Sequence, residues 1–239
     1  MIEVMENKEL YDGFYSESYT KHFFNKLSES YFLTQVFSSG LANLIRKKCI
    51  SLLTKNLKHK DNLIIADFMS GSGENNRFFN GFKIKKIINI DFSDKMIELA
   101  KRRKHTDIIY LNENVLKCSL KNDTAHGIIS TFGLKTLSEE STIDLAKQTK
   151  RVLKEKGSFC FSEFNLKGFT KLFVFALLFF QISICVFLFP FHNARLHYNF
   201  LSYSNNFSGN KAYKIFKQEF PNAKKINMLN LVIFIYGTK

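Results

Sequence analysis

The sequence predicts an α/β fold: a seven-stranded, mostly parallel sheet with helices on both faces, N-terminal helices ahead of it and an apolar lid insertion near its end. Three observations predict this fold. Residues 62–164 alternate short apolar runs with amphipathic stretches, which is typical of a parallel sheet covered by helices. A glycine-rich turn follows the first apolar run. Two more apolar runs, after residue 224, close the chain and complete the sheet.

The expected strands are short and mainly apolar, as buried strands usually are. They are Leu63–Ala66, Ile87–Ile90, Ile108–Leu111, Gly127–Thr131, Ser158–Ser162, Lys225–Leu229 and Leu231–Gly237. A helix is expected at Asp94–Lys104, because Ser93 can cap its start and apolar residues recur every three or four positions. Another is expected at Ser138–Lys154, with Gly157 as its stop.

The 239 residues are expected to form one domain, since this length suits a single hydrophobic core. Within it the sequence predicts four parts. They are a helical cap at residues 1–60, a cofactor-binding core at 61–164, an apolar lid insertion at 165–210, and a closing helix with two strands at 211–239.

Composition and charge narrow the class of protein. Hydrophobic residues make up 45% of the chain and charged residues 23%, which indicates a globular protein. The net charge of +14 favours anionic partners, but the Lys and Arg residues are spread over many segments, so a solvated basic surface is the simpler interpretation. The scattered Cys and His residues lack metal-ligand spacing, so no metal is expected. The charged N-terminus has no apolar core, which predicts a cytoplasmic location.

A glycine-rich turn follows the first strand and is the first candidate for a binding site. Gly71 and Gly73 can adopt positive φ and bring the backbone close to a ligand, and a helix is expected next, with unpaired N–H groups at its start. The third glycine of a dinucleotide fingerprint is replaced by Asn76, which disfavours NAD and FAD. Asp91, at the end of the second strand, can accept hydrogen bonds from ribose hydroxyls. Together these features predict a nucleotide-like ligand.

At these residues the sequence resembles the class I S-adenosylmethionine-dependent methyltransferases, whose sheet is Rossmann-like. Among them it is most similar to the C-methyltransferases of menaquinone and ubiquinone biosynthesis. The resemblance covers most of the chain and is carried by residues 67–74, 90–93 with Met96, 112–115, 130–135, 151–157 and 163–164. A weaker similarity, at residues 24–31 and 38–40, is to that family's N-terminal substrate segment.

The resemblance implies that S-adenosyl-L-methionine is the cofactor. It implies that the binding residues are Asp67, Gly71, Ser72, Gly73, Asp91, Phe92, Asn114, Val115 and Thr131. The three turn residues would line the methionine and ribose side, and Asp91 would hold the ribose. Asn114 and Val115 would flank the adenine, and Thr131 would close the site at the fourth strand. Asp67 would organise the turn or the amino group. An Asx-turn at Asn114 and ordinary packing at Val115 and Thr131 are the structural alternatives.

The resemblance also implies a lipophilic small-molecule acceptor, with methyl transfer to an aromatic, quinol-type carbon. Positioning dominates such an in-line displacement, but a neighbouring phenol must lose or share its proton. Tyr31, Lys135 and Glu163 are the candidates for a base or cation. Each also has a structural interpretation: Tyr31 as a lid aromatic, Lys135 as a solvated loop charge, and Glu163 as a structural acceptor.

The sequence departs from the quinone family at positions that the resemblance places near the acceptor. Lys135 and Thr136 stand where the family usually has Arg-Asn, and His126 stands where an acid is common. The alternatives are therefore an O- or N-methyltransferase of a small metabolite, a methyltransferase-fold cyclase in natural-product biosynthesis, and a non-catalytic membrane-surface binding protein. No nucleic-acid partner is expected, because residues 130–133 lack the Asn or Asp with Pro-Pro that grips a flipped base.

The segment Leu172–Phe191 holds twenty residues without a formal charge, which is long enough to cross a bilayer. A single crossing would separate the closing strands from the rest of their sheet, so we expect a lid over an apolar acceptor pocket or a patch that dips into the membrane surface. Plain core packing is the simpler alternative. The sequence therefore predicts a cytoplasmic protein in which this segment is either a lid or a peripheral contact with the membrane.

Overall fold

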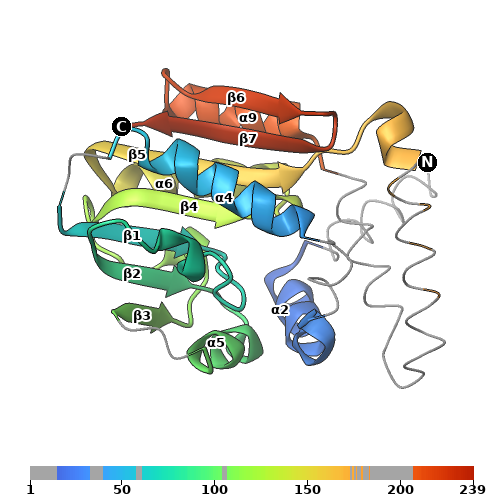
Figure 1. Cartoon of the computed structure of the whole chain (residues 1–239), viewed down its shortest axis with the longest axis horizontal. Helices are drawn as coiled ribbons and strands as arrows, with labels where there is room; N and C mark the ends of the chain where they lie inside the picture. Colours follow the sequence, from blue (N-terminus) through green and yellow to red (C-terminus); the bar gives the residue numbers. More distant parts are fainter. Residues whose placement is uncertain are drawn as a thin grey trace.

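The computed structural model describes residues 15–32, 40–57, 61–103, 107–172, 174, 176, 179, 183 and 207–239. Within them, seven strands form one sheet with helices packed on both of its faces (Figure 1). The predicted fold class is therefore confirmed. The sheet brings together strands from residues 63 to 238, so the core and the closing segment share one structural unit.

All seven expected strands are present. They are β1 (Leu63–Phe68), β2 (Ile84–Ile90), β3 (Ile108–Leu111), β4 (Ala125–Thr131), β5 (Leu153–Phe164), β6 (Lys224–Met228) and β7 (Val232–Thr238). Strands β2 and β5 begin several residues earlier than expected. Their first halves carry exposed Lys and Glu side chains, so the apolar signal covers only the buried second halves.

The strand order is β3-β2-β1-β4-β5-β7-β6. The first five strands pair in parallel, and β7 runs antiparallel to both of its neighbours. From β1 the chain winds outward to β2 and β3, and then returns to β4 on the other side of β1. In a sheet of this kind the crevice at the carboxyl ends of the two central strands is where ligands bind.

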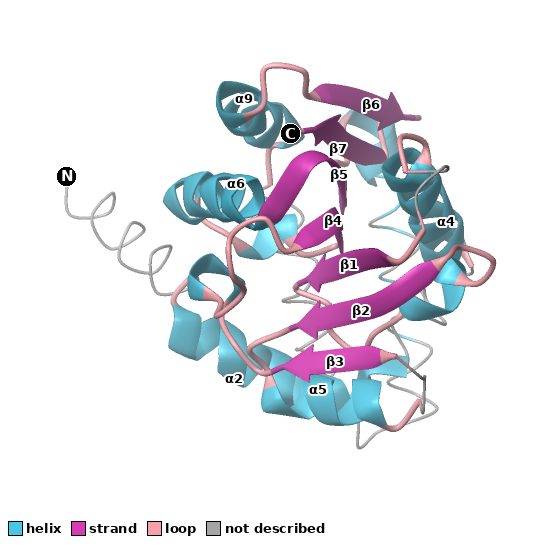
Figure 2. Cartoon of the chain, turned by 90° about the vertical axis from the view of Figure 1, so that its left-hand side faces the viewer, coloured by secondary structure: helices cyan, strands magenta, loops and turns pink. Residues whose placement is uncertain are grey.

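Helices cover the two faces of the sheet, with a hydrophobic core on each side (Figure 2). One core lies under α4 (Leu41–Thr54), which buries Ile45, Cys49 and Leu53 against the sheet. The other lies under α6 (Glu139–Val152) and α9 (Gly209–Glu219). Helix α5 (Asp94–Lys101) begins where expected, because Ser93 accepts a hydrogen bond from the Met96 N–H. Burying one stripe of each helix in this way supplies most of the stabilisation of such a fold.

The expected helix after the glycine-rich turn is absent, and this prediction was wrong. Residues 76–79 form a single short 3-10 helix (Asn76–Phe79), and the chain then turns at Gly81 into β2. Adjacent asparagines are poor helix formers, and few residues separate the turn from β2. The turn therefore does not lead directly into an α-helix, and a ligand here has to be held by groups other than the N-terminus of such a helix.

The predicted stop of α6 at Gly157 was also wrong. The helix ends at Val152, and β5 starts at the next residue. Gly157 instead lies in a bulge of β5, where the pairing with β4 shifts register between Ala125 and Gly127. A Cβ atom on Gly157 would lie 2.7 Å from the Lys154 carbonyl oxygen, so the bulge requires glycine.

The N-terminal cap is helical in its described part, with α2 (Glu17–Leu27), a 3-10 turn (Ser28–Ser30) and α4. Most of the predicted lid at residues 165–210, including nearly all of Leu172–Phe191, lies outside the described residues. Among the described residues, no helix is long and apolar enough to cross a membrane. Whether Leu172–Phe191 forms a lid or contacts a membrane therefore stays a prediction.

Candidate functional site

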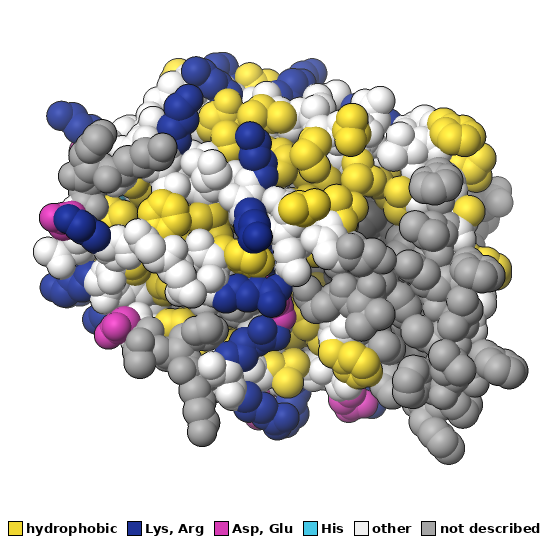
Figure 3. Space-filling model, viewed as in Figure 1, with side chains coloured by type: hydrophobic (Ala, Val, Ile, Leu, Met, Phe, Trp, Pro, Cys, Tyr) yellow, Lys and Arg dark blue, Asp and Glu magenta, His cyan; other side chains and the backbone are white. Residues whose placement is uncertain are grey.

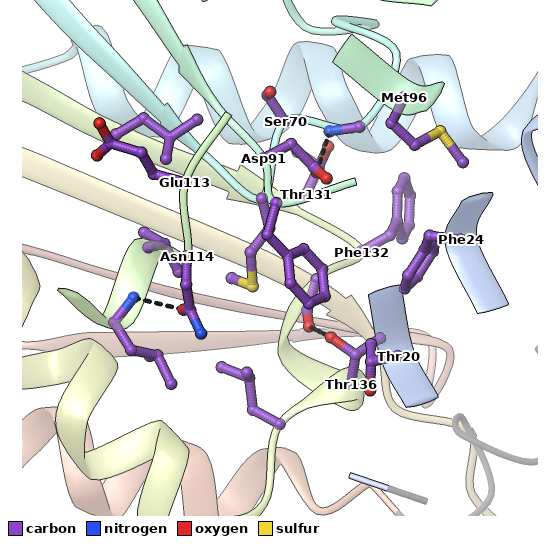
Figure 4. A pocket seen from close by; sticks show the side chains of 18 of the residues that line it. Thr20, Phe24, Ser70, Asp91, Met96, Glu113, Asn114, Thr131, Phe132 and Thr136 are labelled. Atoms are coloured by element: carbon purple, nitrogen blue, oxygen red, sulfur yellow. Dashed lines mark hydrogen bonds between the residues drawn. The ribbon is translucent and has the colours of Figure 1, made fainter. Parts of the chain in front are cut away.

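The main cavity of the described structure, about 220 Å³ in volume, opens at the carboxyl ends of β1, β2 and β4. The strand ends and the loop after β3 form one wall. Tyr15, Tyr31 and side chains from α2 and α4 form the opposite wall. Figure 4 shows Thr20 and Phe24 of α2 on the side of the cavity opposite Asp91 and Thr131. The cavity thus lies at the switch point of the sheet, where the sequence predicted a site.

Asp91 ends β2 and carries a buried carboxylate that borders the cavity. One oxygen, Oδ2, accepts a hydrogen bond of 2.8 Å from the Gly71 N–H. The other, Oδ1, accepts one of 2.9 Å from the Ser93 N–H. Burial raises the pKa of Asp91 to about 6, and the two backbone bonds oppose that rise. A carboxylate has about four acceptor positions, so Asp91 retains lone pairs for a ligand's hydroxyl groups.

The turn after β1 needs left-handed backbone at three positions. Met69, Gly71 and Gly73 have φ values of 55°, 53° and 71°. A Cβ on Gly73 would lie 2.8 Å from the side-chain nitrogen of Asn76, so close packing excludes a larger residue there. Gly71 borders the cavity, where a Cβ would meet only the Tyr31 hydroxyl at 3.7 Å. The turn therefore presents open backbone to the cavity at Gly71 and packs inward at Gly73.

Three side chains connect the turn to β4 beneath the cavity. The buried Asp67 carboxylate accepts two hydrogen bonds of 3.1 Å from the Asn75 amide nitrogen. The Asn75 oxygen in turn accepts one of 3.1 Å from the Thr131 hydroxyl. Burial raises the pKa of Asp67 to about 7, and the Asn75 bonds oppose the rise. Asn75 and Thr131 line the cavity and Asp67 does not, so Asp67 organises the turn from below.

The loop after β3 contributes Asn114 and Val115 to the cavity wall. The Asn114 oxygen accepts a hydrogen bond of 2.9 Å from the Leu116 N–H, which is the Asx-turn that the sequence left open. The same side chain donates to Glu17 of α2 and lowers the pKa of that carboxyl. Asn114 therefore shapes the loop and ties it to the N-terminal cap while bordering the cavity.

Phe132, directly after β4, lines the cavity and has an unusual backbone conformation. Its φ of 65° is rare for a residue with a side chain, and such strain needs support from the surroundings. The Phe132 N–H donates to the Ser162 carbonyl, and its ring stacks on Phe164 at 4.8 Å. The Arg46 guanidinium of α4 lies over the ring, 5.2 Å from its centre. Both Phe132 and Arg46 line the cavity.

Lys135 and Glu163 form a fully buried ion pair, with 3.0 Å between the Lys135 Nζ and a Glu163 carboxylate oxygen. Nζ also donates to the Phe132 carbonyl at 2.7 Å. Glu163 accepts the backbone N–H groups of Lys135 and Phe164 as well. Burial lowers the pKa of Lys135, and Glu163 opposes that change. Neither residue lines the main cavity. The interpretation of Lys135 as a solvated loop charge is wrong, and the geometry gives no direct contact between this pair and a ligand there.

Most, but not all, of the predicted residues meet at the cavity. Those that line it are Tyr31, Gly71, Asp91, Phe92, Asn114, Val115 and Thr131. Ser72 and Gly73 lie within the turn and, like Asp67, do not line it. His126 was expected near the acceptor, and this was wrong: it lies at the opposite end of β4, where its Nδ1 accepts the Ile64 N–H at 3.0 Å. Thr136 does line the cavity.

Sequence reasoning missed several cavity residues, notably Arg46, Ser70 and Asn75. Ser70 and Asn75 belong to the glycine-rich segment, so their position beside Gly71 and Gly73 could have predicted them as cavity residues. Arg46 stands in an amphipathic helix next to two lysines, where a charged residue usually faces solvent. Its burial, with 3% of its surface exposed, follows only from how α4 packs.

The residues present fit S-adenosylmethionine. The Ser70 hydroxyl is buried at the cavity wall and has no hydrogen-bond partner within the described part of the chain, so a ligand would satisfy it. Asp91 offers acceptors for ribose hydroxyls, and Val115 with Met96 offers an apolar surface for a flat base. In the described ranges, no group of three or more His, Cys, Asp or Glu is arranged to hold a metal ion.

Residues 65–157 match the family model of a methyltransferase domain. The matched segment runs from β1 to β5 and includes Gly71, Asp91, Asn114 and Thr131, but it is less than half of the chain. A search of curated proteins gives no match.

Solved structures share the fold. A candidate S-adenosyl-L-methionine-dependent methyltransferase of Methanococcus maripaludis is 17% identical, with 91% of this chain and 94% of that chain covered and a TM-score of 0.58. A candidate methyltransferase of Haloferax volcanii, solved with a methyltransferase activator, is 12% identical, with 90% and 96% covered and a TM-score of 0.53. A Mesorhizobium loti S-adenosylmethionine-dependent methyltransferase is 24% identical, with 47% and 52% covered and a TM-score of 0.42, so the chain spans about half its length. The chain has the Rossmann-like methyltransferase fold, and the domain match supports S-adenosylmethionine as the cofactor.

A lysine variant tests the role of the buried ion pair. Lys135→Met leaves Glu163 buried without its cation, which we expect to lower the free energy of unfolding by about 3–5 kcal/mol. Adding Glu163→Gln removes the buried charge, so the double variant should regain much of the loss. Urea denaturation measures both. Equal destabilisation of the single and double variants would contradict this account.

Asp67 makes stability depend on pH. Its pKa is about 7 in the folded chain and about 3.9 when unfolded, so the native state binds more protons between these values. The contribution of Asp67 is therefore fully present below pH 4 and is lost as the pH rises through 7. Relative to Asp67→Asn, the wild type should lose stability over this window in thermal unfolding. Asp61→Asn, at an exposed ion pair with Lys83, is the control and should leave the pH profile unchanged.

Proposed function

We propose that the chain transfers the methyl group of S-adenosylmethionine to a lipophilic small molecule, with an aromatic, quinol-type carbon as the acceptor. The observation that carries the methyl-transfer part is the Asp91 carboxylate, bonded to the Gly71 N–H at the switch point of the sheet. It lies within the segment that matches the methyltransferase-domain model. The aromatic part rests on the opposite wall of the cavity and on the resemblance to quinone C-methyltransferases.

When bound, S-adenosylmethionine would supply a methyl carbon on a positively charged sulfur. The acceptor carbon would take this methyl group in an in-line displacement, with S-adenosylhomocysteine as the leaving group and the displaced ring proton passing to water. The protein mainly has to hold the reacting atoms in line, about 3–3.5 Å apart. In the proposed complex, Asp91 accepts the ribose hydroxyls and fixes the cofactor along the strand ends. Val115 and Phe92 would lie along the adenine side, and Thr131 and Asn75 would limit the space for the ligand at the end of β4.

Aromatic side chains dominate the wall that faces the proposed cofactor position. Tyr15, Phe24, Tyr31 and Phe132 all line this part of the cavity. Flat rings on several sides suit a flat aromatic acceptor, because offset and edge-to-face contacts are favourable. The strained backbone of Phe132, supported by Lys135 and Ser162, keeps one of these rings in place.

Tyr31 is the one predicted catalytic residue that borders the main cavity. Burial raises the pKa of its phenol, so the hydroxyl stays protonated at neutral pH. A protonated phenol donates a hydrogen bond and is a poor base. We infer that Tyr31 orients an acceptor oxygen by donating to it, and that Lys135 and Glu163 act indirectly by holding Phe132.

An apolar rim next to β6 and β7 fits a lipophilic acceptor drawn from a membrane surface. The rim consists of Phe169, Leu172 and Leu229, all strongly exposed. The Lys167 N–H bonds to the Asn230 carbonyl, which places the start of this segment beside the β6–β7 turn. Figure 3 shows exposed hydrophobic side chains interspersed with Lys and Arg on the face that carries α4. Exposed apolar groups with basic neighbours suit anionic lipid.

Cofactor binding tests the methyl-transfer proposal directly. Asp91→Asn removes the charge that would accept the ribose hydroxyls, and we expect it to weaken S-adenosylhomocysteine binding about 10- to 100-fold in calorimetry. Asp94→Asn, at an exposed ion pair with Lys21 near the same strand end, should bind like the wild type. Failure of the wild type to bind at millimolar ligand would refute the proposal.

Methylation of a membrane extract tests the acceptor. Vesicles made from the lipid extract of the source cells are incubated with the protein and methyl-labelled S-adenosylmethionine, and the label is followed into the organic phase. We expect organic-phase label with the wild type, little with Asp91→Asn, and several-fold less with Phe169→Ser/Leu172→Ser, which should still bind S-adenosylhomocysteine. Label confined to water-soluble products would rule out a lipophilic acceptor.

A further inference from the structure

We propose that Arg46 binds the carboxylate of the cofactor's methionine arm. This inference rests on the proposed function, because it assumes that S-adenosylmethionine occupies the main cavity. It adds a positioning residue from α4, outside the segment that matches the methyltransferase-domain model. Arg46 would then fix the end of the cofactor opposite to the adenine.

Arg46 combines burial with access to the cavity. Only 3% of its surface is exposed, yet it lines the main cavity. Its guanidinium lies over the ring of Phe132, which holds it away from bulk solvent. Burial lowers the pKa of this group, and nearby acids and Tyr31 oppose that change. A cation kept at a cavity wall in this way favours an anion beside it.

The charges of the lining residues favour a bound carboxylate near Arg46. Within the described part of the chain, it is the only Lys or Arg among the lining residues. The other charged lining residues are acidic: Glu17, Glu74, Asp91 and Glu113. Glu74 forms ion pairs with Arg77 and Arg103, and neither of these two residues lines the cavity. A bound carboxylate would be repelled by the acidic side chains and attracted only near Arg46.

The path of the cofactor also leads toward Arg46. With the ribose at Asp91, the next feature along the wall is Gly71, bonded to Asp91. The Tyr31 hydroxyl lies close to Gly71, and Arg46 interacts electrostatically with Tyr31 and with Asp67 beneath the turn. The pairwise contacts from Asp91 to Gly71, from Gly71 to Tyr31 and from Tyr31 to Arg46 thus connect the proposed ribose site to Arg46.

The test compares two ligands that differ in the amino-acid arm. S-adenosylhomocysteine carries the carboxylate, whereas 5′-methylthioadenosine has the same adenosine and a thioether but no amino acid. Calorimetry measures both ligands against wild type, Arg46→Gln and Arg46→Lys. We expect Arg46→Gln to weaken S-adenosylhomocysteine binding about 10- to 100-fold, because a charge-assisted bidentate pair is lost. Binding of 5′-methylthioadenosine should change less than about twofold.

Arg46→Lys keeps the charge but loses the planar fork, so its loss for S-adenosylhomocysteine should fall between those of the other two proteins. This variant also gives the readout if Arg46→Gln does not fold. Equal losses for both ligands, or none for either, overturn the assignment. A normal S-adenosylhomocysteine affinity with impaired methyl transfer places Arg46 at the acceptor and also overturns it. If the wild type binds neither ligand, the proposed function itself fails.

Discussion

The hydrogen bond from the Gly71 N–H to the Asp91 carboxylate is the contact on which the cavity depends. Parallel pairing aligns the ends of β1 and β2 but leaves the loops beyond them undetermined. This bond fixes the turn after β1 against the end of β2, and it requires the left-handed backbone at Gly71. The second oxygen of Asp91 accepts the Ser93 N–H, where α5 begins. One carboxylate therefore orients the turn, the strand end and the helix.

Two buried carboxylates, Asp67 and Asp91, lie in this arrangement, and hydrogen bonds from amide groups stabilise them. Burial raises the pKa of both Asp67 and Asp91, because a carboxylate loses solvation when it leaves water. Backbone N–H groups stabilise Asp91, and the Asn75 side chain stabilises Asp67. Asn75 also accepts from Thr131, so a single amide side chain connects β1, the turn and β4. Asn75 therefore stabilises a buried charge and also helps to shape the cavity, which it lines together with Thr131.

The strands and the residues on the sheet side of the cavity could be predicted, because buried apolar runs and a glycine-rich turn are local signals. Two local signals gave wrong predictions. A helix was expected after the glycine-rich turn, but adjacent asparagines and a short connection give a 3-10 turn there. Gly157 was expected to end a helix, but it lies in a bulge of β5. Lys135 was interpreted as a solvated loop charge because its partner, Glu163, is 28 residues away in the sequence. Only the folded sheet brings the two side chains together. Arg46 was missed for the same reason: its burial depends on packing that the helix pattern does not specify.

The two walls of the cavity have different origins. The wall with Asp91 and Gly71 comes from the sheet, whose pairing constrains every residue. The wall with Phe24, Tyr31 and Arg46 comes from residues before β1, which pack on the sheet without pairing with it. Apart from Arg46, the proposed cofactor contact, its side chains can change without altering the strands, so the proposed acceptor contacts can vary while the Asp91 side of the cavity is retained. Lys135, beneath Phe132, links the two walls by fixing the one ring that follows β4 and also contacts Arg46.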